Sequence, residues 1–400
     1  MSDLLPAPLS GQVDLLFVVG EHSGDENAAR VLRDLLARQP NLRVCALGGP
    51  RLAAAGAQLL RDLTAQSAMG FAVIAKLSHY RKLIAEVVDW VGQYRPRAVC
   101  FVDSSGLNLR IAAGLHARGF SAKAGGPTKA LYYISPQIWA SRAGRRFQMA
   151  RQLDGLAAIF PFEPAVYADT SLPVEFVGHP FLAPDYAPPV AFDPAGPVLL
   201  LPGSRRGVVQ RIFPLLLAAY RASGADRPAV VLYPSEEIRA VLQAANPPAG
   251  VTLQSIAEGR AATPFAAGNE PARSGVRALP PVAAAAVLTA SGTMSMHCAL
   301  AGIPGALTYR TDALTYFLGR LLVKVEFIGI ANLLLKEAMY PEFIQGAATP
   351  AALAAELRAC LQDPARAART AAQRDKLRAL LAQPAGGTAA DWLARQLARP

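Results

Sequence analysis

Short apolar segments, each ending in a loop of small or polar residues, constrain the fold of this chain most strongly. Residues 13–19, 98–102, 130–134 and 155–159 are apolar without the alternation of a half-exposed strand. Such runs are typical of parallel strands that are buried on both faces. Residues 27–38 have helical spacing of apolar positions, which completes a strand–loop–helix order. The first half of the chain therefore predicts a Rossmann-like α/β unit.

The same pattern starts again after a proline-rich stretch. Residues 180–197 carry prolines and acids and predict an interdomain linker. Apolar runs at 198–201, 229–233 and 284–290 then indicate further buried strands, and a helix is expected through 211–221. We found no sequence repeat, so the similarity between the halves is one of architecture.

These observations predict an α/β protein with two Rossmann-like domains that face a cleft, followed by C-terminal helices. We expect an N-terminal domain over 1–185, a C-terminal domain over 196–348 and Ala-, Leu- and Arg-rich helices over 349–400. This is the two-domain architecture of the GT-B glycosyltransferases. Ligands of open α/β sheets bind beyond the carboxyl ends of the strands. Residues 262–281, rich in Gly, Pro and Ala, are expected to form a flexible insertion.

The charge balance favours anionic partners. Forty Lys and Arg residues against 29 Asp and Glu residues give a formal net charge of +11. Such an excess suits phosphorylated small molecules, nucleic acid or an acidic membrane surface. The alternative explanation of the charge is compositional drift in a GC-rich genome, which would also explain why Arg far outnumbers Lys. The basic residues are dispersed and match no nucleic-acid-binding motif, so no nucleic-acid partner is expected.

Cysteine usage and hydropathy indicate a reducing compartment. Cys45, Cys100, Cys298 and Cys360 are scattered, without CxxC spacing, so neither a disulfide framework nor a metal site is expected. The N-terminus lacks the basic region of a signal peptide. No apolar run reaches the roughly 18 residues that span a bilayer. We therefore expect a cytoplasmic protein, with attachment to a membrane surface left open.

The loop over 20–25 follows the first strand and contains Glu21, Ser23, Gly24 and Asp25. Glycine lets a backbone approach a ligand, and the amides at a helix start attract anions. Ser and Asp are also ordinary N-cap residues, so capping explains part of the loop. No GxGxxG pattern is present, and a dinucleotide site has no direct support.

Polar residues also follow two later strands of the first half. Asp103 ends the strand over 98–102, where a carboxylate facing a cleft suits a general base, although a lone Asp there is more often a cap. Ser135, Trp139 and Arg142 follow the next strand. An aromatic ring beside a cation suits contact with a sugar or an acyl chain, and Trp as a core anchor is equally plausible. His179, near the linker, is expected to be a structural hydrogen-bonding residue.

Two loops in the second half suit an anionic ligand such as a diphosphate. Their residues are Gly203, Ser204 and Arg205 after one strand, and Ser291, Gly292 and Thr293 after another. Small residues, hydroxyl groups and a fixed cation beside a helix start favour phosphate binding. A solvated basic turn and a simple Ser or Thr cap are the alternatives. The spacing excludes a Walker A loop.

An amphipathic segment over 68–83 places apolar side chains beside basic ones. Its apolar residues are Met69, Phe71, Val73, Ile74 and Leu77. This pattern is typical of an interfacial helix that meets anionic lipid. A helix that packs on the core and has a solvated basic edge is the alternative.

Taken in order, these segments resemble the lipid-A-disaccharide synthase family. The matching stretches are GEHSGD (20–25), GGPR (48–51), AMGF (68–71), VDSSGLN (102–108), ISPQIWASR (134–142), FPFE (160–163), FVGHPF (176–181), PGSRRG (202–207), ASGT (290–293), YR (309–310), LTYFLGRLLVKVEFIGIANLL (314–334) and PEFIQGAATP (341–350). The resemblance covers about 15–360, and the ordered set is more specific than any single motif.

The resemblance implies an inverting glycosyltransferase of lipid A assembly with the GT-B fold. It would join UDP-2,3-diacylglucosamine to 2,3-diacylglucosamine 1-phosphate and release UDP, without a metal or another cofactor. Asp103 matches the family's catalytic Asp. The loops with Arg205 and Thr293, together with Asn332, match its donor site. The family further implies peripheral attachment to the anionic inner face of the inner membrane and a homodimer.

The chain departs from the family pattern at several donor-side positions. His297 and Val208 stand where the family has Glu residues, and Ser105 and Ala331 stand where it has prolines. Two carboxylates are thus absent. Three alternatives stay open: the lipid A enzyme itself, a GT-B enzyme with another UDP-sugar or lipid acceptor, and a non-catalytic relative that binds lipid or nucleotide.

Overall fold

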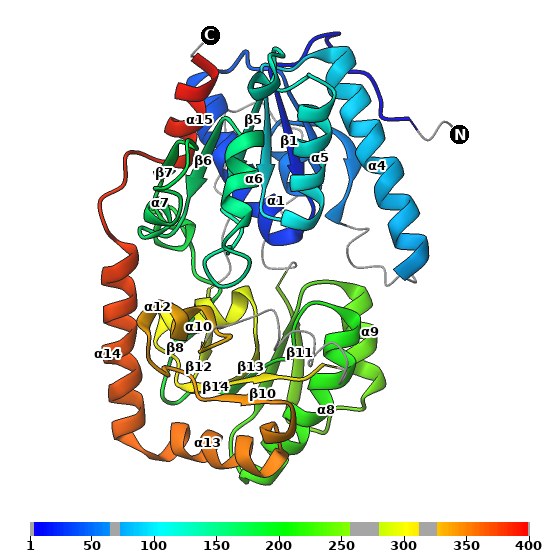
Figure 1. Cartoon of the computed structure of the whole chain (residues 1–400). Coiled ribbons are helices and arrows are strands. Elements are labelled where there is room, and N and C mark those ends of the chain that lie inside the picture. Colours follow the sequence, from blue (N-terminus) through cyan, green and yellow to red (C-terminus); the bar gives the residue numbers. More distant parts are fainter. Residues whose placement is uncertain (1–3, 65–72, 257–279, 312–325, 399–400) are drawn as a thin grey trace, which may run out of the picture. The chain divides into compact units, whose positions relative to one another are not determined.

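The computed structural model describes residues 4–64, 73–256, 280–311 and 326–398. The chain divides into two compact units (Figure 1). Unit 1 is Met1–Ala183 with Leu381–Pro400, and unit 2 is Pro184–Leu380. The last fifty residues are helical, but they do not form a part of their own, because their helices pack on both units.

Unit 1 contains one parallel sheet of seven strands in the order β3-β2-β1-β4-β5-β6-β7. The strands are β1 (Leu15–Val19), β2 (Val44–Gly48), β3 (Gln58–Asp62), β4 (Ala98–Val102), β5 (Lys129–Tyr133), β6 (Gly155–Ala158) and β7 (Val174–Phe176). This is the Rossmann strand order, and the chain reverses direction across the sheet between β1 and β4. Every residue of β1 and β4 is buried, as their unalternating sequences predict.

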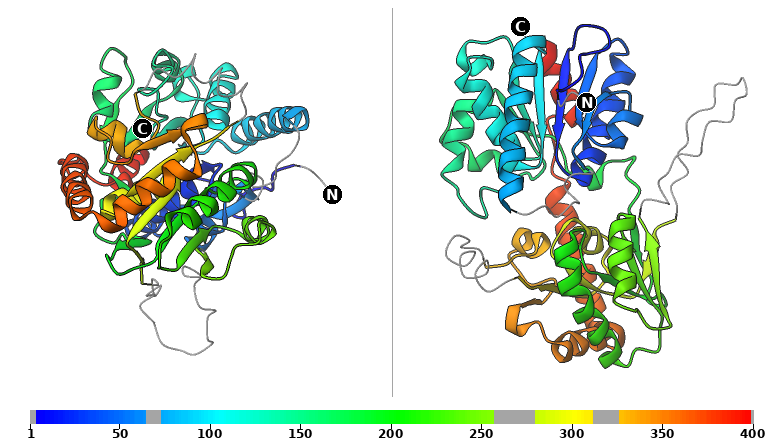
Figure 2. Two further views of the ribbon diagram at one scale, coloured as in Figure 1. Left: turned by 90° about the horizontal axis from the view of Figure 1, so that it is seen from below. Right: turned by 90° about the vertical axis from the view of Figure 1, so that its right-hand side faces the viewer.

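Helices cover both faces of this sheet (Figure 2). They are α1 (His22–Arg38), α2 (Pro50–Ala54), α4 (Val73–Tyr94), α5 (Ser105–Ala117), α6 (Arg145–Gln152), α7 (Glu163–Val166) and α15 (Ala389–Ala398), with short 3-10 turns at Ala122–Ala124 and Pro180–Leu182. Helix α1 packs against α2 and α15, and α4 packs against α5. The core of unit 1 is formed by side chains such as Phe101, Ile111 and Tyr132.

Unit 2 repeats the arrangement with six parallel strands in the order β11-β10-β9-β13-β14-β15. They are β9 (Val198–Leu201), β10 (Ala229–Tyr233), β11 (Val251–Ser255), β13 (Ala286–Ala290), β14 (Gly305–Tyr309) and β15 (Glu342–Ile344); β8 (Val190–Phe192) and β12 (Val282–Ala284) form a separate parallel pair. The helices are α8 (Arg206–Ser223), α9 (Glu236–Ala244), α10 (Thr293–Ala301), α12 (Ile330–Leu335), α13 (Pro350–Gln362) and α14 (Pro364–Leu381), with a 3-10 turn at Gln345–Ala347. The reversal here lies between β9 and β13.

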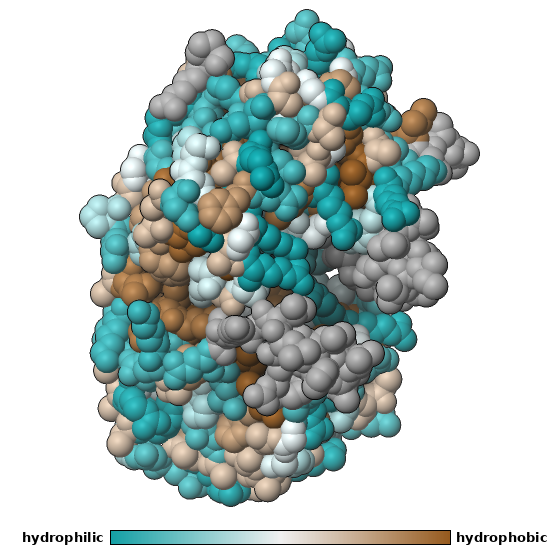
Figure 3. Space-filling view, viewed as in Figure 1, coloured by the Kyte–Doolittle hydropathy of each residue, from teal (hydrophilic) through white to brown (hydrophobic). Residues whose placement is uncertain are grey.

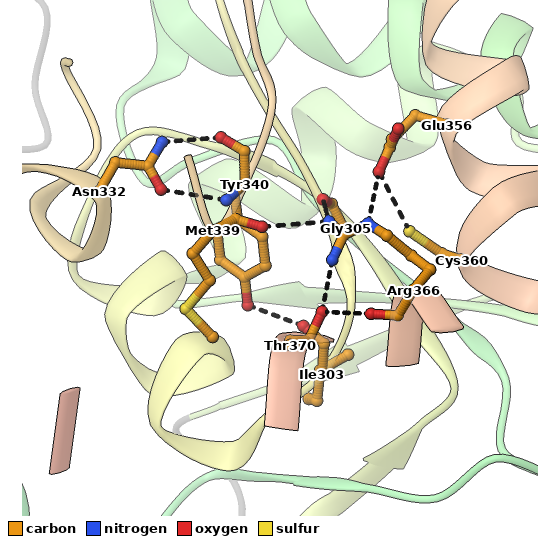
Figure 4. Close-up of polar contacts among 9 residues, drawn as sticks. All are labelled: Ile303, Gly305, Asn332, Met339, Tyr340, Glu356, Cys360, Arg366 and Thr370. Atoms are coloured by element: carbon orange, nitrogen blue, oxygen red, sulfur yellow. Dashed lines mark hydrogen bonds and ion pairs between the residues drawn. The ribbon is translucent and has the colours of Figure 1, made fainter. Parts of the chain in front are cut away.

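A buried arginine ties α13 and α14 to this sheet (Figure 4). The guanidinium of Arg366 donates to the carbonyl oxygens of Gly305 (2.9 Å) and Met339 (3.1 Å) and to Oε1 of Glu356 (2.8 Å). It also contacts Thr370. A buried charge needs such partners, since an uncompensated one is costly. These bonds explain why α13 and α14 belong to unit 2.

Three sequence predictions differ from the structure. The helix expected over 27–38 begins at His22, so most of the 20–25 loop is the first turn of α1. The strand expected over 284–290 is divided after Ala284. The carbonyl oxygen of Ala284 accepts a hydrogen bond from the amide of Asp193, whereas the amide of Ala285 donates one to the carbonyl oxygen of Pro197. The linker expected over 180–197 contains β8, because pairing with β12 gives this short segment a strand partner.

Some predictions fall on residues that the structure does not describe. Met69 and Phe71 are among them, and the side chains of Val73, Ile74 and Leu77 in α4 are also outside the described part. The insertion expected over 262–281 lies outside it except for its last two residues. Of the described helices, none combines the length and apolar character needed to cross a membrane.

Candidate active site

Both sheets place their polar loops at the point where the strand order reverses. In unit 1, Gly20 follows β1 and Asp103 follows the neighbouring β4, with Val19 paired to Val102. In unit 2, the loops after β9 and β13 occupy the equivalent place. Crevices at this point of an open α/β sheet are where such folds bind ligands. The loops at the two reversal points are therefore the candidate ligand-binding loops of the two units.

Asp103 lies on a strained turn between β4 and α5. Asp103 and Ser104 both have left-handed backbone angles, with φ of 49° and 40°. This conformation costs residues other than glycine roughly 1–2 kcal/mol each. Strain of this kind persists only where the surroundings fix it, and it is concentrated at functional sites. The amide of Asp103 donates to the carbonyl of Tyr133 over 3.2 Å, which holds one side of the turn.

Two buried side chains hold the other side. The Nδ2 atom of Asn108 donates to the carbonyl oxygens of Asp103 (2.9 Å) and Val102 (3.1 Å) and, more weakly, to that of Val18 (3.4 Å). The hydroxyl of Tyr132 also donates to the Asp103 carbonyl. Burial, followed by the charge of Asp103, raises the pKa of Tyr132 well above its usual value, so its hydroxyl keeps the proton that it donates.

Glycines let the first turn of α1 pack directly against this turn. A Cβ atom on Gly20 would lie 2.7 Å from Oγ of Ser104. A Cβ atom on Gly24 would lie 2.8 Å from Cγ1 of Val19 and 3.8 Å from Cβ of Asp103. The 20–25 loop and Asp103 are thus brought together by the pairing of β1 with β4.

Asp25, at the end of the 20–25 loop, binds main-chain amides within unit 1. It is buried, and its carboxylate accepts from the amides of Gly49 (2.8 Å), Arg51 (3.0 Å) and Leu52 (3.3 Å). A carboxylate at the start of a helix satisfies amides that have no partner within the helix. Asp25 therefore fixes the start of α2 against α1.

The buried Ser135 and the half-buried Trp139 lie beside the buried Glu163. The indole nitrogen of Trp139 donates to Oε1 of Glu163 over 3.3 Å, and its ring lies edge-on to Phe162 at 5.1 Å. The hydroxyl of Ser135 lies 2.8 Å from that of Tyr167. Burial raises the pKa of Glu163 to about 7, although hydrogen bonds from main-chain amides and from Trp139 oppose the shift. The core-anchor alternative therefore fits Trp139, while Arg142 is exposed.

His179 joins the same aromatic region. Its Nδ1 atom accepts from the amide of Phe181 over 3.2 Å, and its ring lies 5.5 Å from that of Phe160. Burial lowers the pKa of His179 to about 3, so the ring is neutral near pH 7. The structural role expected for His179 agrees with these contacts.

In unit 2, two helices begin side by side at the reversal point. Leu201 of β9 is paired with Thr289 of β13, so the loops that follow are adjacent. A Cβ atom on Gly203 would lie 3.9 Å from that of Ala290. Ser204, Arg205, Ser291, Gly292 and Thr293 are all exposed there. Arg205 is the N-cap residue of α8 and its side chain does not cap the helix, and the N-cap residue of α10 is Gly292, which has no side chain that could cap it. The helix-start amides therefore face a place where an anion can bind.

His297 does not lie on that loop. It lies one turn into α10, is 8% exposed, and stacks on Tyr186 with the two rings inclined by only 7°. The Tyr186 hydroxyl is 2.7 Å from Nδ1 of His297. Tyr186 therefore holds the imidazole in place beside the start of α10.

Asn332, which was expected at the donor site, is held by hydrogen bonds within unit 2 (Figure 4). It is 1% exposed, and both ends of its amide are engaged. Nδ2 donates to the carbonyl of Tyr340 (2.7 Å) and to Oε1 of Glu342 (2.9 Å), and Oδ1 accepts from the amide of Tyr340 (3.0 Å). Glu342 in turn accepts from the amides of Ile328 and Gly329. Asn332 thus fixes the chain around α12 and the entry to β15.

Comparison with known proteins agrees with this architecture. A family model described as lipid-A-disaccharide synthetase matches residues 15–232 and 270–394. The lipid-A-disaccharide synthase of Geobacter metallireducens is 32% identical over 375 residues, covering 91% of this chain and 92% of that protein. That of Anaeromyxobacter dehalogenans is 33% identical over 383 residues, covering 92% and 94%.

The chain belongs to the lipid-A-disaccharide synthase family. Membership makes it a glycosyltransferase of lipid A biosynthesis and confirms the resemblance that the sequence indicated.

Solved structures confirm the predicted GT-B fold. The calicheamicin glycosyltransferase CalG4 has a TM-score of 0.55 at 17% identity, covering 97% of this chain and 99% of that chain. The spinosyn forosaminyltransferase SpnP has a TM-score of 0.53 at 13% identity, covering 97% and 100%. At such low identity the likeness concerns the fold alone.

Sequence reasoning missed three residues that contact predicted site residues: Asn108 beside Asp103, Glu163 beside Trp139 and Tyr186 beside His297. Asn108 was visible in the VDSSGLN stretch, but its role depends on the positions of three carbonyls. Glu163 ends the FPFE stretch and precedes Pro164. An acid followed by a proline is a signal for the start of a helix, and α7 begins there. Tyr186 gave no signal, because its pairing with His297 is purely tertiary.

Proposed function

We propose that this chain joins UDP-2,3-diacylglucosamine to 2,3-diacylglucosamine 1-phosphate, giving the β-1,6-linked disaccharide 1-phosphate and UDP. The observation that carries the proposal is the position of Asp103. It lies at the reversal point of unit 1, on a left-handed turn that Asn108 and Tyr132 hold by its carbonyl. Membership of the lipid-A-disaccharide synthase family supports this choice of substrates.

In the proposed reaction Asp103 is the general base. Its carboxylate takes the proton of the acceptor 6-hydroxyl as that oxygen forms a bond to C1 of the donor sugar. The bond from C1 to the UDP oxygen breaks on the opposite face, so configuration is inverted in one displacement. The fixed main chain keeps the carboxylate where the hydroxyl must arrive, and such positioning accounts for part of the rate.

Unit 2 would hold the donor and stabilise the leaving group. Negative charge develops on the diphosphate as UDP departs, and fixed donors aimed at that charge lower the barrier. The exposed starts of α8 and α10 provide main-chain amides, and Arg205 provides a cation. Gly203, Ser204, Ser291, Gly292 and Thr293 let the diphosphate approach this backbone. No metal-dependent step is part of the proposal.

One observation favours a second candidate, a GT-B enzyme with a different UDP-sugar. His297, held by Tyr186, replaces an acid that the family pattern carries near the start of α10. An imidazole can donate as well as accept hydrogen bonds, so it recognises donor hydroxyls differently from a carboxylate. Tyr186→Phe would then change the preference between donors, whereas it leaves that preference unchanged if His297 is only structural.

We also propose that the protein works as a peripheral protein on the anionic inner face of the inner membrane, as a homodimer. Both proposed substrates are acylated, and the net charge of +11 favours an anionic surface. Co-sedimentation with vesicles of neutral and anionic phospholipid tests the first point. Sedimentation velocity in detergent tests the second.

A transfer assay with purified protein tests the function. UDP-2,3-diacylglucosamine and UDP-N-acetylglucosamine are each supplied with the acylated 1-phosphate acceptor in detergent, with and without a chelator. We expect disaccharide and UDP in equal amounts from the acylated donor only. Turnover of another UDP-sugar alone would favour the second candidate, and no UDP binding would favour a non-catalytic relative.

A further inference from the structure

The loop over 134–142, which follows β5, has a strained backbone at both of its ends. Ile134 begins the loop and Arg142 ends it, and both have left-handed backbone angles, with φ of 64° and 59°. This conformation is especially unfavourable for a β-branched residue such as Ile134. Strain of this kind persists only where neighbouring groups enforce it. The loop therefore depends on contacts that fix its conformation.

The start of this loop is joined to the proposed base through the main chain. The amide of Asp103 donates to the carbonyl of Tyr133, the last residue of β5, over 3.2 Å. The next amide, that of Ile134, donates to the carbonyl of Ala157 in β6 over 3.1 Å. The sheet neighbours of β4 are β1 and β5. An acceptor that binds at Asp103 therefore extends over the loop that follows one of these two strands.

Glu163 connects this loop to the one that follows β6. Its side chain is fully buried. Oε2 accepts from the amides of Ile159 and Phe160, over 3.2 Å and 3.1 Å, and so closes the turn after β6. Oε1 accepts from the indole nitrogen of Trp139 over 3.3 Å. Closing its own turn requires only Oε2, so the bond made by Oε1 is the one that joins the two loops.

Aromatic contacts hold Trp139 on other sides. Its ring lies edge-on to those of Phe160 and Phe162, with 6.1 Å and 5.1 Å between ring centroids. Trp139 and Phe162 are nevertheless only half-buried. Figure 3 shows apolar surface next to α7, the helix that Phe162 precedes. Trp139 therefore anchors the loop without being sealed in the core, and the surface around it stays open to a ligand.

We propose that Glu163 is a positioning residue, which holds Trp139 and thereby the 134–142 loop in the conformation that receives the acceptor. This inference rests on the proposed function, because it assigns the loop beside Asp103 to the same acceptor. Glu163 acts through Trp139 and touches no reacting atom. A small displacement of the loop lowers the rate, because the acceptor hydroxyl then meets the base in a less favourable geometry.

Glu163→Gln separates positioning from folding. The one oxygen of glutamine can keep both main-chain amides, but its NH2 group then faces the Trp139 indole, which is also a donor. The variant therefore loses the bond between the loops and keeps the turn after β6. At pH 8 we expect kcat/KM for the acceptor to fall by about tenfold. The KM for the donor should be unchanged, and the Tm should be no lower than that of the unmodified protein.

A double-mutant cycle with Trp139→Phe tests the contact itself. Phenylalanine keeps an aromatic ring and removes the indole donor, so it breaks the same bond from the other side. In the Trp139→Phe background, Glu163→Gln should have little further effect on the acceptor kinetics. The matched controls are Glu236→Gln, on the surface of α9, and Trp90→Phe, which removes an indole bond to the Pro6 carbonyl. Neither control should change kcat/KM for the acceptor.

Three outcomes would overturn the proposal. Unchanged acceptor kinetics in folded Glu163→Gln would show that Glu163 does not position the loop. A lower Tm with equal losses for donor and acceptor would assign Glu163 a structural role alone. Fully additive effects in the cycle would show that Glu163 does not act through Trp139. If the unmodified protein transfers no sugar, the proposed function fails and this inference fails with it, and that result is seen before any substitution is made.

Discussion

The side-chain amide of Asn108 donates a hydrogen bond of 2.9 Å to the main-chain carbonyl of Asp103. The donor lies on α5 and the acceptor lies on the turn that precedes this helix, so the helix fixes the conformation of its own entry. Asn108 is fully buried and also reaches the carbonyls of Val102 and Val18. One side chain thus joins the ends of β1 and β4 to the residue that we propose as the base.

Replacing Asn108 with Ala should reduce both stability and turnover. The three carbonyls lose their common donor, and leaving buried polar groups unsatisfied costs about 1–3 kcal/mol. We expect the free energy of unfolding in urea to fall by that amount. We also expect kcat to fall more than the affinity for UDP, because the Asp103 turn loosens. Gln148→Ala, an exposed change on α6, is the control. An unchanged kcat in folded Asn108→Ala would contradict this positioning role.

Gly20 and Ser104 should be energetically coupled. A Cβ atom at position 20 would lie 2.7 Å from Ser104 Oγ, so Gly20→Ala requires the Ser104 side chain to move. Overpacking of this kind typically costs about 1–3 kcal/mol. Ser104 Oγ is buried and has no hydrogen-bond partner among the described residues, so Ser104→Ala alone should cost little.

The double variant tests that coupling. Removing the Ser104 hydroxyl makes room for the new methyl group, so Gly20→Ala should cost less in the Ser104→Ala background. Urea unfolding of the four proteins gives the interaction energy. Strictly additive effects would show that the two residues do not meet as described.

Much of the fold could be predicted because its central strands are buried on both faces. β4 coincides with the predicted 98–102, and β9 and β10 coincide with 198–201 and 229–233. The strands β3 and β11 lie at sheet edges and are only partly buried, so their sequences mix polar and apolar residues and gave no signal.

The position of the candidate site could be predicted from the sequence, but the contacts of its side chains could not. Strand ends followed by small or acidic residues pointed to Asp103 and to the Gly203 loop. Which side chains support them depends on the packing of distant segments. Asn332 and Asp25 matched site motifs, yet main-chain groups that only the fold brings near occupy their side chains.

Glu163 should make stability depend on pH. Burial raises its pKa to about 7 in the folded protein from an ordinary value of 4.5, so the folded state holds a proton that the unfolded state loses. The contribution of Glu163 to stability is therefore greatest below about pH 4.5 and falls as pH rises towards 7, by roughly 3 kcal/mol in all. Glu163→Gln, which imitates the protonated form, should be more stable than the unmodified protein at about pH 8.

His179 makes stability depend on pH in the opposite sense. The effect of Glu163 is therefore measured as the difference in stability between Glu163→Gln and the unmodified protein. The pKa of His179 is lowered to about 3, which makes the folded state less stable as pH falls below 6.5. This contribution is the same in both proteins and cancels when Glu163→Gln is compared with the unmodified chain. Urea unfolding near pH 5 and pH 8 provides the measurement. A stability difference that does not change with pH would show that Glu163 is ionised throughout.

Asn332→Ala should act through stability and leave donor binding almost unchanged. The substitution removes hydrogen bonds with Tyr340 and Glu342, at a cost of about 1–3 kcal/mol. We expect a lower Tm and, at temperatures where the variant is folded, an unchanged KM for the donor. A higher donor KM without a loss of stability would show that Asn332 contacts the donor.

The most direct test of the central claim compares the unmodified protein with Asp103→Asn in the transfer assay. Asparagine keeps the size of the side chain and removes its ability to take a proton at the reacting oxygen. We predict that the disaccharide product falls by about a hundredfold or more, the range typical of losing a general base. UDP binding and Tm should stay close to those of the unmodified protein. Substantial turnover by folded Asp103→Asn would contradict the assignment of Asp103 as the base.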